Sequence, residues 1–512
     1  MVARTGEDAA RAVSKRELMK HLRVPREITL ADLKAKDTSW SAGMYRRVEI
    51  PTSHTRRVRE LIAGYNKGSD PGSMYYLEKS TRHFIRTKAL QAHSYLISPK
   101  GGSITPINPR VFEDMALADG DILLSKDSNV GECAMVDGDR WRNHTLSGGI
   151  VRLRPSINRH YLFAFLKHEL FKTELLSMVP RGATIAHANE LWLDCRIPFP
   201  AQHDADQVIV YVATLAEAII EKEKAIRTRN DEIHAQIEAE LSANQTGKAF
   251  QYAHPTLDEL RKTLRLDTGL YCRGFRAFQH RVDNYRLGAT TLSAMGVRSR
   301  RGPNLAVSVI GKSLYSETYK PDWYEIIRPV NIGEYGTLNS REWLGSPKKL
   351  PTVNRGDLIL GCEGFGKGRS LVLVDAPTRC TTNFHGTVLY WPGGQMWQTI
   401  FVRCFLAYLR EHGVIDWVGV GGSGGHMSPD YFDYLPFPRF PDDVRERIAR
   451  LYHNPATSPA RKATLGSFVA WHREWNEGLG IWELDRELKA LQRTLTEVQE
   501  QIIEGRAVKI PI

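Results

Sequence analysis

The stretch GDILLSKDSNVGECAMVD, which begins at Gly120, is followed later in the chain by a close copy, GDLILGCEGFGKGRSLVLVD, which begins at Gly356. Each copy leads to a second shared phrase, IPFP at Ile197 and LPFP at Leu435. The two phrases recur in the same order and at nearly the same spacing. A repeat this long is too large for a solenoid unit and indicates a whole domain present twice.

Within each copy, short runs typical of strands, such as DILLS and GGIVRLR, are separated by Gly, Pro and Asn. One helical stretch follows them, over 161–178 in the first copy and 396–411 in the second, and a glycine-containing loop and a proline-rich exit come next. We therefore predict two mixed α/β domains, over residues 21–203 and 246–440, after a loose tail at 1–20.

A long amphipathic helix is expected after each domain, over residues 204–245 and 481–505. Their apolar residues recur mostly at steps of three and four, which is the pattern of a coiled-coil seam. The simplest arrangement pairs the two helices antiparallel, although each could instead cover its own domain. A short helix and an insertion, 441–480, precede the second helix. The predicted seam includes Val212, Leu215, Ile219, Leu488, Leu491 and Leu495.

Composition limits the class of protein. The chain of 512 residues carries a formal net charge of +12, which favours a polyanionic partner such as nucleic acid, or simply a basic enzyme. Its six cysteines are scattered, without the spacing of a disulfide framework or a zinc site. The first twenty residues are too polar for a signal peptide, and the most apolar stretch, 208–220, is too short to span a membrane. We expect a cytoplasmic protein without a membrane partner.

One motif suggests an enzyme. The stretch GCEGFGKG, Gly361–Gly368, nearly matches a phosphate-binding loop, but it lacks the final Ser or Thr. A strand-like run, SLVLVD, follows it where a helix should begin. A turn between two strands is therefore favoured over a nucleotide site, and the nucleotide-dependent enzyme remains the alternative. No motif of an amino-methylating methyltransferase, no metal-ligand spacing and no acid–base pair stands out. We predict no metal residues, and a nuclease built from dispersed acidic residues stays open as an alternative.

Two glycine loops lie at matching places in the copies, RGATIAHA at 181–188 and GGSGGHMS at 421–428. Glycine allows a ligand to approach the backbone closely, although a strained turn at a helix exit explains these loops equally well. Small polar and basic side chains nearby suit contacts with DNA. The candidates to face DNA are Arg181, Thr184 and His187 in the first copy, with Lys367, Arg369, Ser423 and His426 in the second.

The order of these features resembles the specificity (S) subunit of type I restriction-modification enzymes. The resemblance rests on the repeated GD phrases, the glycine loops, the IPFP and LPFP exits and the two heptad helices, and it covers most of residues 21–505. One departure is the stretch 453–480, which interrupts the second helical region. A coiled-coil adaptor of another phage-defence complex would share the same features and is a further alternative.

The resemblance implies two target recognition domains, each reading one half of a bipartite, asymmetric sequence in double-stranded DNA. It implies that the helix pair is a spacer that docks two methyltransferase (M) subunits, and that restriction (R) subunits can join them. It also implies that this chain has no catalytic residues and no cofactor of its own. S-adenosylmethionine, ATP and Mg would be used by the partner subunits.

Overall fold

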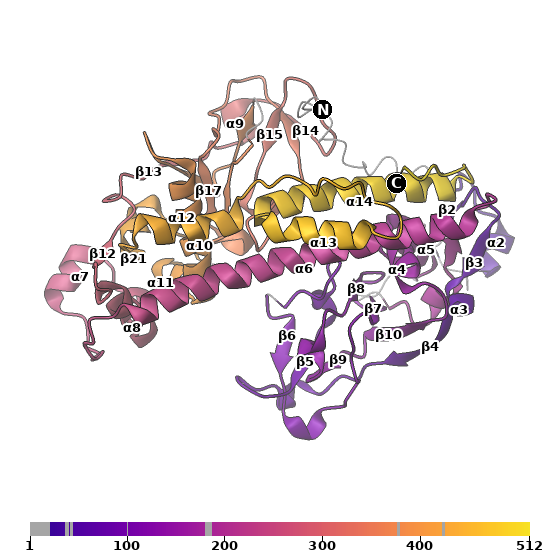
Figure 1. Ribbon diagram of the computed structural model, residues 1–512, viewed down its shortest axis with the longest axis horizontal. Coiled ribbons are helices and arrows are strands. Elements are labelled where there is room, and N and C mark those ends of the chain that lie inside the picture. Colours follow the sequence, from indigo (N-terminus) through magenta and orange to yellow (C-terminus); the bar gives the residue numbers. More distant parts are fainter. Residues whose placement is uncertain are drawn as a thin grey trace. The chain divides into compact units, whose positions relative to one another are not determined.

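The structure, a computed structural model, divides into two compact units, which are described one at a time (Figure 1). It describes residues 21–35, 40, 45–99, 101–179, 187–375, 379–421 and 425–511. Among these, the first unit holds residues up to 224 together with 458–476 and 487–511. The second unit holds 225–457 and 477–486.

A four-stranded antiparallel sheet forms the centre of the first unit, in the order β4–β10–β7–β8. Its strands are β4 (Ile62–Lys67), β10 (Ile150–Pro155), β7 (Ile122–Ser125) and β8 (Cys133–Met135). A smaller sheet joins β5 (His83–Ile85) to β6 (Ile104–Pro106) antiparallel and to β9 (His144–Leu146) parallel. The DILLS run is buried at every strand position, as its unbroken apolar character predicts.

The second unit repeats this arrangement, with one strand added to its smaller sheet. Its main sheet has the order β13–β20–β17–β18, again antiparallel throughout. Its strands are β13 (Arg298–Arg301), β20 (Gly386–Tyr390), β17 (Leu358–Gly361) and β18 (Ser370–Val372). In the smaller sheet, β15 (Tyr324–Ile326) pairs antiparallel with β16 (Trp343–Gly345) and parallel with β19 (Cys380–Thr381), and β14 (Leu314–Ser316) is added at the edge.

The two shared phrases have the same structural role in both units. Gly120 and Gly356, which open the GD phrases, both adopt a positive φ, where glycine is the favoured residue. The following Asp121 and Asp357 accept backbone hydrogen bonds from Ala118 and Asn354, at 2.8 and 2.9 Å, and so close the turn before the strand. The exits form β11 (Arg196–Pro198), which pairs with β3 (Thr55–Arg57), and β21 (Phe437–Pro438), which pairs with β12 (Ala289–Thr290). The predicted repeat of a mixed α/β domain is confirmed.

Helices cover these sheets. In the first unit α4 packs on β8, and in the second α10 packs on β17 and β18. The helices and the remaining strands of the first unit are β1 (Leu22–Arg23), α2 (Leu30–Ala35), β2 (Arg47–Val48), α3 (Val58–Leu61), α4 (Arg159–Lys167) and α5 (Glu169–Met178). Those of the second unit are α7 (Leu257–Thr263), α8 (Arg273–Asp283), α9 (Val307–Ile310), α10 (Met396–Glu411), α11 (Val414–Val418) and α12 (Asp442–Tyr452).

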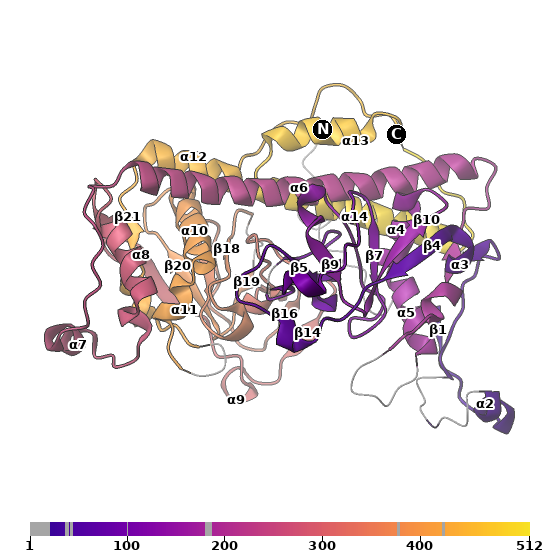
Figure 2. The same ribbon diagram turned by 90° about the horizontal axis from the view of Figure 1, so that it is seen from below.

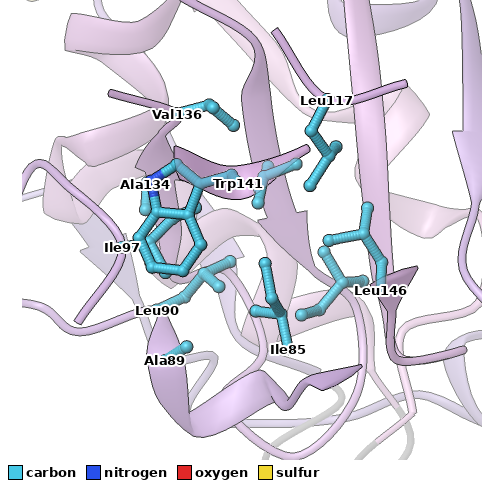
Figure 3. Close-up of a cluster of buried hydrophobic side chains, with 11 residues drawn as sticks. Ile85, Ala89, Leu90, Ile97, Leu117, Ala134, Val136, Trp141 and Leu146 are labelled. Carbon is cyan, nitrogen blue, oxygen red and sulfur yellow. The ribbon is translucent and has the colours of Figure 1, made fainter. Parts of the chain in front are cut away.

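Each unit has its own apolar core. In the first unit, Trp141 and side chains from β5, β7, β8, β9 and β10 meet in one buried cluster (Figure 3). In the second unit, Ile359, Leu371 and Val388 from the main sheet occupy the corresponding cluster. Burying a Leu or Ile side chain stabilises a fold by about 1.5–3 kcal/mol. Each cluster therefore stabilises the unit that contains it.

The long central helix is α6 (Ala205–Ala243), which begins in the first unit and continues into the second, and the C-terminal helix is α14 (Ile481–Ile503). Gln202, before α6, exchanges two hydrogen bonds with the backbone of Val508, after α14, at 3.1 and 2.6 Å. In the second unit, Arg229 of α6 donates to the carbonyls of Glu477 and Leu479, before α14 begins. The two helices therefore run antiparallel.

The stretch predicted as an insertion contains α13 (Phe468–Gly478). In the first unit this helix packs on α6 through polar contacts. The Lys222 Nζ, which is fully buried, donates to Asn476 Oδ1 at 2.8 Å and lies 4.9 Å from the centre of the Trp475 ring. Arg473 donates to Glu221 at 2.9 Å and to Glu217 at 3.3 Å. The structure therefore assigns this segment a place on the face of α6.

We expect acid to destabilise the first unit through His144. Its ring stacks on His83, with 5.0 Å between centroids, and meets Trp141 edge-on. Burial, followed by the charge of His83, lowers the pKa of His144 to about 4 from 6.5, so the folded state holds it neutral. Above pH 6.5 His144 is neutral in both the folded and the unfolded state, so it does not change stability with pH. Between pH 6.5 and about 4 the unfolded state binds an additional proton, so the free energy of unfolding falls.

Replacing His144 by Phe should therefore reduce the loss of stability between pH 7 and pH 4.5 by about 1–2 kcal/mol. Thermal unfolding midpoints at the two pH values measure this difference. The exposed His54 of the same unit, replaced by Gln, is the control. An unchanged pH dependence in His144→Phe would contradict the assignment.

Candidate functional site

An acidic residue follows the central strand of each main sheet, and the glycine loop returns to meet it. Asp127 lies just after β7 and forms an isolated β-bridge with His187, while Glu363 lies just after β17 and forms one with His426. Neighbouring backbone bonds are also shared. Ala188 N donates to Lys126 O at 2.8 Å in the first unit, and Met427 N donates to Cys362 O at 2.9 Å in the second.

The side chains of these bridge partners meet in the same way. His187 Nδ1 lies 2.9 Å from Asp127 Oδ1, and His426 Nδ1 lies 2.8 Å from Glu363 Oε1. Both histidines were candidates from the sequence, and the structure gives each a carboxylate partner. Each unit thus carries a histidine–carboxylate pair at the end of its central strand.

A basic residue occupies the same position on the edge strand of each main sheet. Strand register makes Lys67 of β4 equivalent to Arg301 of β13, because their partners on β10 and β20 are themselves equivalent. Both are followed by a glycine, Gly68 or Gly302, where a Cβ atom would lie about 2 Å from a backbone carbonyl oxygen of a neighbouring loop. The basic residue and its glycine therefore form a second shared element.

In the second unit, one arginine and two histidines contact Glu363. Arg301 Nη2 donates to Glu363 Oε1 at 2.6 Å, and His385 hydrogen-bonds the other carboxylate oxygen. The guanidinium of Arg301 lies 3.9 Å from the centre of the Phe384 ring, a cation–π contact. Burial acts to raise the pKa of Glu363, but His385, His426 and Arg301 outweigh it and lower that pKa, so the carboxylate stays ionised.

These groups border a cavity of about 780 Å³ in the second unit. Two polar atoms beside it are buried and lack a hydrogen-bond partner among the described residues, Asn383 Oδ1 and Arg301 Nε. The cavity therefore offers an acceptor, a carboxylate and several donors to a ligand. Its lining is Arg328, Pro329, Val330, Glu363, Gly364, Gly366, Asn383, His385, Val420, Gly421, Gly425 and His426.

The corresponding site of the first unit has different side chains at equivalent positions. Gly148 and Gly149 stand where the second unit has Phe384 and His385, as the register of β10 and β20 shows. Asp127 is instead approached by Lys126, whose Nζ lies 2.9 Å from Oδ2. A Cβ at Gly149 would lie 2.8 Å from Thr87 Cγ2 and 3.1 Å from Asp127 Cβ, so a larger side chain does not fit without a shift.

Two other candidates are engaged within the protein. Lys367 Nζ lies 2.8 Å from Asp416 Oδ1, with a side chain 11% exposed. Arg369 donates to Ile332 O at 3.0 Å and to Glu334 at 2.9 Å. Arg181, Thr184 and Ser423 lie outside the residues that the structure describes.

The stretch Gly361–Gly368 is the connection between β17 and β18, which pair antiparallel. A phosphate loop instead precedes a helix whose N-terminal amides bind the anion. Here only a single 3₁₀ turn, Gly364–Gly366, precedes β18. This geometry contradicts the nucleotide-binding alternative.

The predicted seam residues Val212, Leu215 and Ile219 are buried on α6, and Leu488, Leu491 and Leu495 are buried on α14. In the described part of the chain, no helix combines the length and apolar character that a membrane crossing requires. The same residues contain no group of three or more His, Cys, Asp or Glu side chains arranged to hold a metal ion.

Comparison with known proteins gives similarity at the level of solved structures. No family model matches the chain, and no curated protein matches it. The S subunit of a type I restriction-modification system from M. genitalium is similar, with 11% sequence identity, a TM-score of 0.39, and coverage of 89% of this chain and 96% of that one.

Two further structures are similar over 89% of this chain at 13% identity. One belongs to work on complex assembly and conformational transition of the type I R-M system, with a TM-score of 0.27 and 99% of that chain covered. The other is the HsdS subunit from Thermoanaerobacter tengcongensis, with a TM-score of 0.26 and 98% covered.

Proposed function

We propose that this chain is a non-catalytic, sequence-specific DNA-binding subunit of a type I restriction-modification complex. Each unit would read one half of a bipartite, asymmetric target in double-stranded DNA. The observation that carries the proposal is the common framework of the two sites, in which a histidine–carboxylate pair and a basic residue recur. The side chains around that framework differ between the units.

This combination suits two domains that bind the same kind of molecule but read different bases. Arg and Lys recognise guanine O6 and N7, Asn recognises adenine, and carboxylates accept a hydrogen bond from the cytosine amino group. The second unit offers Arg301, Asn383 and Glu363 for these contacts, whereas the first offers Lys67 and Asp127. The net charge of +12 suits phosphate contacts on both units.

Two half-sites on one chain multiply specificity, since each wrong base pair costs about 1–3 kcal/mol. We propose that α6 and α14 act as the spacer, with Val212, Leu215, Ile219, Leu488, Leu491 and Leu495 in its seam. A stiff spacer makes the second half-site contact intramolecular and rejects targets with the wrong gap.

The partners follow from the same proposal. Two methyltransferase subunits would dock on the helices, and restriction subunits could join the complex. These partners would use S-adenosylmethionine, ATP and Mg. The complex would act in the cytoplasm, where its DNA lies.

The test is genome-wide mapping of methylated bases in the source organism with and without this gene. We expect the gene's removal to abolish methylation at one gapped, asymmetric motif and to leave other motifs methylated. If methylation stays complete at every motif, the chain is not the specificity subunit of an active methyltransferase. Salt-dependent DNA binding by the purified complex separates the proposal from a coiled-coil adaptor, which would bind no DNA.

A further inference from the structure

A second repeat lies near the start of each unit. The sequence TLADLK, from Thr29, recurs as TLDELR, from Thr256. The two stretches form α2 and α7, and each helix projects from the main body of its own unit (Figure 2). The residues between these stretches and the GD phrases match poorly between the two copies. The agreement of the two short stretches therefore needs an explanation.

In both helices a threonine and an acidic residue three positions later form the cap. Thr29 Oγ1 accepts from Asp32 N at 3.1 Å, and Asp32 Oδ2 accepts from Thr29 N at 3.1 Å. Thr256 Oγ1 accepts from Glu259 N at 3.2 Å, and Glu259 Oε2 accepts from Thr256 N at 2.9 Å. These reciprocal bonds satisfy backbone donors that a helix start otherwise leaves open.

The same kind of ion pair also ties both helices to their units. Arg47 Nη2 donates to Asp32 Oδ1 at 3.2 Å, and Arg276 Nη1 donates to Glu259 Oε1 at 2.9 Å. Helices this short are unstable by themselves, so the caps and the arginine clamps keep them in place. Each unit therefore maintains a short helix at a position where it builds little core.

The held helices present a leucine to solvent. Leu30 is 67% exposed and Leu257 is 70% exposed. An exposed basic residue follows on the same helix, Lys34 in α2 and Arg261 in α7, and Leu33 and Leu260 are only half-buried. A leucine and a cation on one small helix suit an apolar socket with an acidic rim on another protein.

The repetition itself identifies the kind of partner. Residues that read different bases should differ between the units, as Gly148–Gly149 and Phe384–His385 do. The features of α2 and α7 instead agree in cap, clamp, leucine and charge, although the sequences around them have diverged. A surface that is kept the same in two divergent units fits two copies of the same partner.

We propose that α2 and α7 each dock one copy of the same protein subunit, with Leu30 and Leu257 as the anchoring side chains. Resting on the proposed function, that subunit is the methyltransferase, which the spacer helices would also contact. The anchor is a short, leucine-bearing helix rather than a long seam. It therefore offers two equivalent contacts per chain, one on each unit.

The test titrates the purified full chain with the co-encoded methyltransferase subunit and measures stoichiometry and affinity by calorimetry. The wild type should bind two equivalents. Leu30→Glu and Leu257→Glu should each weaken one of the two sites about 100-fold, and the double variant should weaken both. Leu266→Glu is the matched control, because Leu266 is 87% exposed near α7 but belongs to no repeated motif; it should bind like the wild type.

These outcomes separate the two proposals. If the wild type binds two methyltransferase subunits and the Leu30 and Leu257 variants bind them equally well, the docking surface is wrong and the proposed function stands. If the wild type binds no methyltransferase although it binds DNA, the proposed membership of a type I complex fails, and this assignment fails with it. The substituted side chains are exposed, and circular dichroism of each variant verifies its fold.

Discussion

Replacing Arg301 by Ala is expected to weaken binding to the half-site read by the second unit by about 10–100-fold, at unchanged affinity for the other half-site. Arg301 is held by Glu363 and by the face of Phe384, so its guanidinium is fixed in place before DNA arrives. A well-oriented arginine contact with guanine contributes about 1–3 kcal/mol of discrimination. Fixing it in advance avoids the cost of ordering the side chain on binding.

The measurement uses fluorescence anisotropy with three duplexes, the full target and two versions in which one half-site is scrambled. Arg301→Ala should match the wild type on the duplex whose second half-site is scrambled, because its contact is already lost there. Lys67→Ala should show the mirror-image pattern with the other half-site. A loss that is equal on all three duplexes would mean that Arg301 contacts only phosphates.

Two variants serve as references. Arg298→Ala removes an exposed arginine from the same strand, and it should lower affinity for all duplexes alike and reduce the salt dependence. Glu363→Gln removes the negative charge that holds Arg301, His385 and His426. It should raise affinity for unrelated DNA while lowering it for the target, so that the ratio between them falls.

Replacing Lys222 by Met is expected to stabilise the first unit by about 2–3 kcal/mol at pH 7, which corresponds to several degrees in unfolding midpoint. The Lys222 ammonium is buried among α6 and α13, with Asn476 and the Trp475 ring as its described contacts. Burial lowers the pKa of Lys222 to about 8 from 10.5, against the opposing charge of Glu487. The lowered pKa means that the protonated form of Lys222 is less stable in the folded state than in the unfolded state, so its charge lowers the free energy of unfolding.

The pH dependence gives the second signature. At pH 7 both the folded and the unfolded state carry the proton on Lys222, and the cost is complete. Between pH 8 and 10.5 the folded state releases that proton first, so wild-type stability should rise relative to Lys222→Met, and the gap between them should close. Thermal unfolding at pH 7 and pH 9.5 measures both effects. Lys224→Met, a partly exposed neighbour on α6, should show neither, and a Lys222→Met protein less stable than the wild type at pH 7 would refute the argument.

The repeat and the helices could be predicted because they depend on patterns that are local in sequence. The GD phrases mark a turn that needs glycine, and the heptad spacing marks α6 and α14. The predicted helix at 396–411 is α10, whereas the one at 161–178 is divided in the structure between α4 and α5 at His168, which caps α5.

The site was harder to predict from the sequence because its residues come from separate segments. The sequence pointed to His187 and His426 but missed their partners, Asp127 and Glu363. The signal was present, since an acidic residue occupies the same place in both copies of the GD phrase. Lys367 attracted attention through its Gly-Lys motif, yet it pairs with Asp416, a residue of α11 that no local pattern connects to it. The equivalence of Lys67 and Arg301 emerges only from strand register.

The difference between Gly149 and His385 also has an evolutionary consequence. His385 and Phe384 are exposed, so exchanging them costs the fold little and new recognition chemistry can arise there by single substitutions. Gly149 is enclosed by Thr87 and Asp127, so almost any replacement must first displace its neighbours. The preference of the second unit should therefore drift readily among related strains, whereas that of the first should change mainly by replacement of the whole unit.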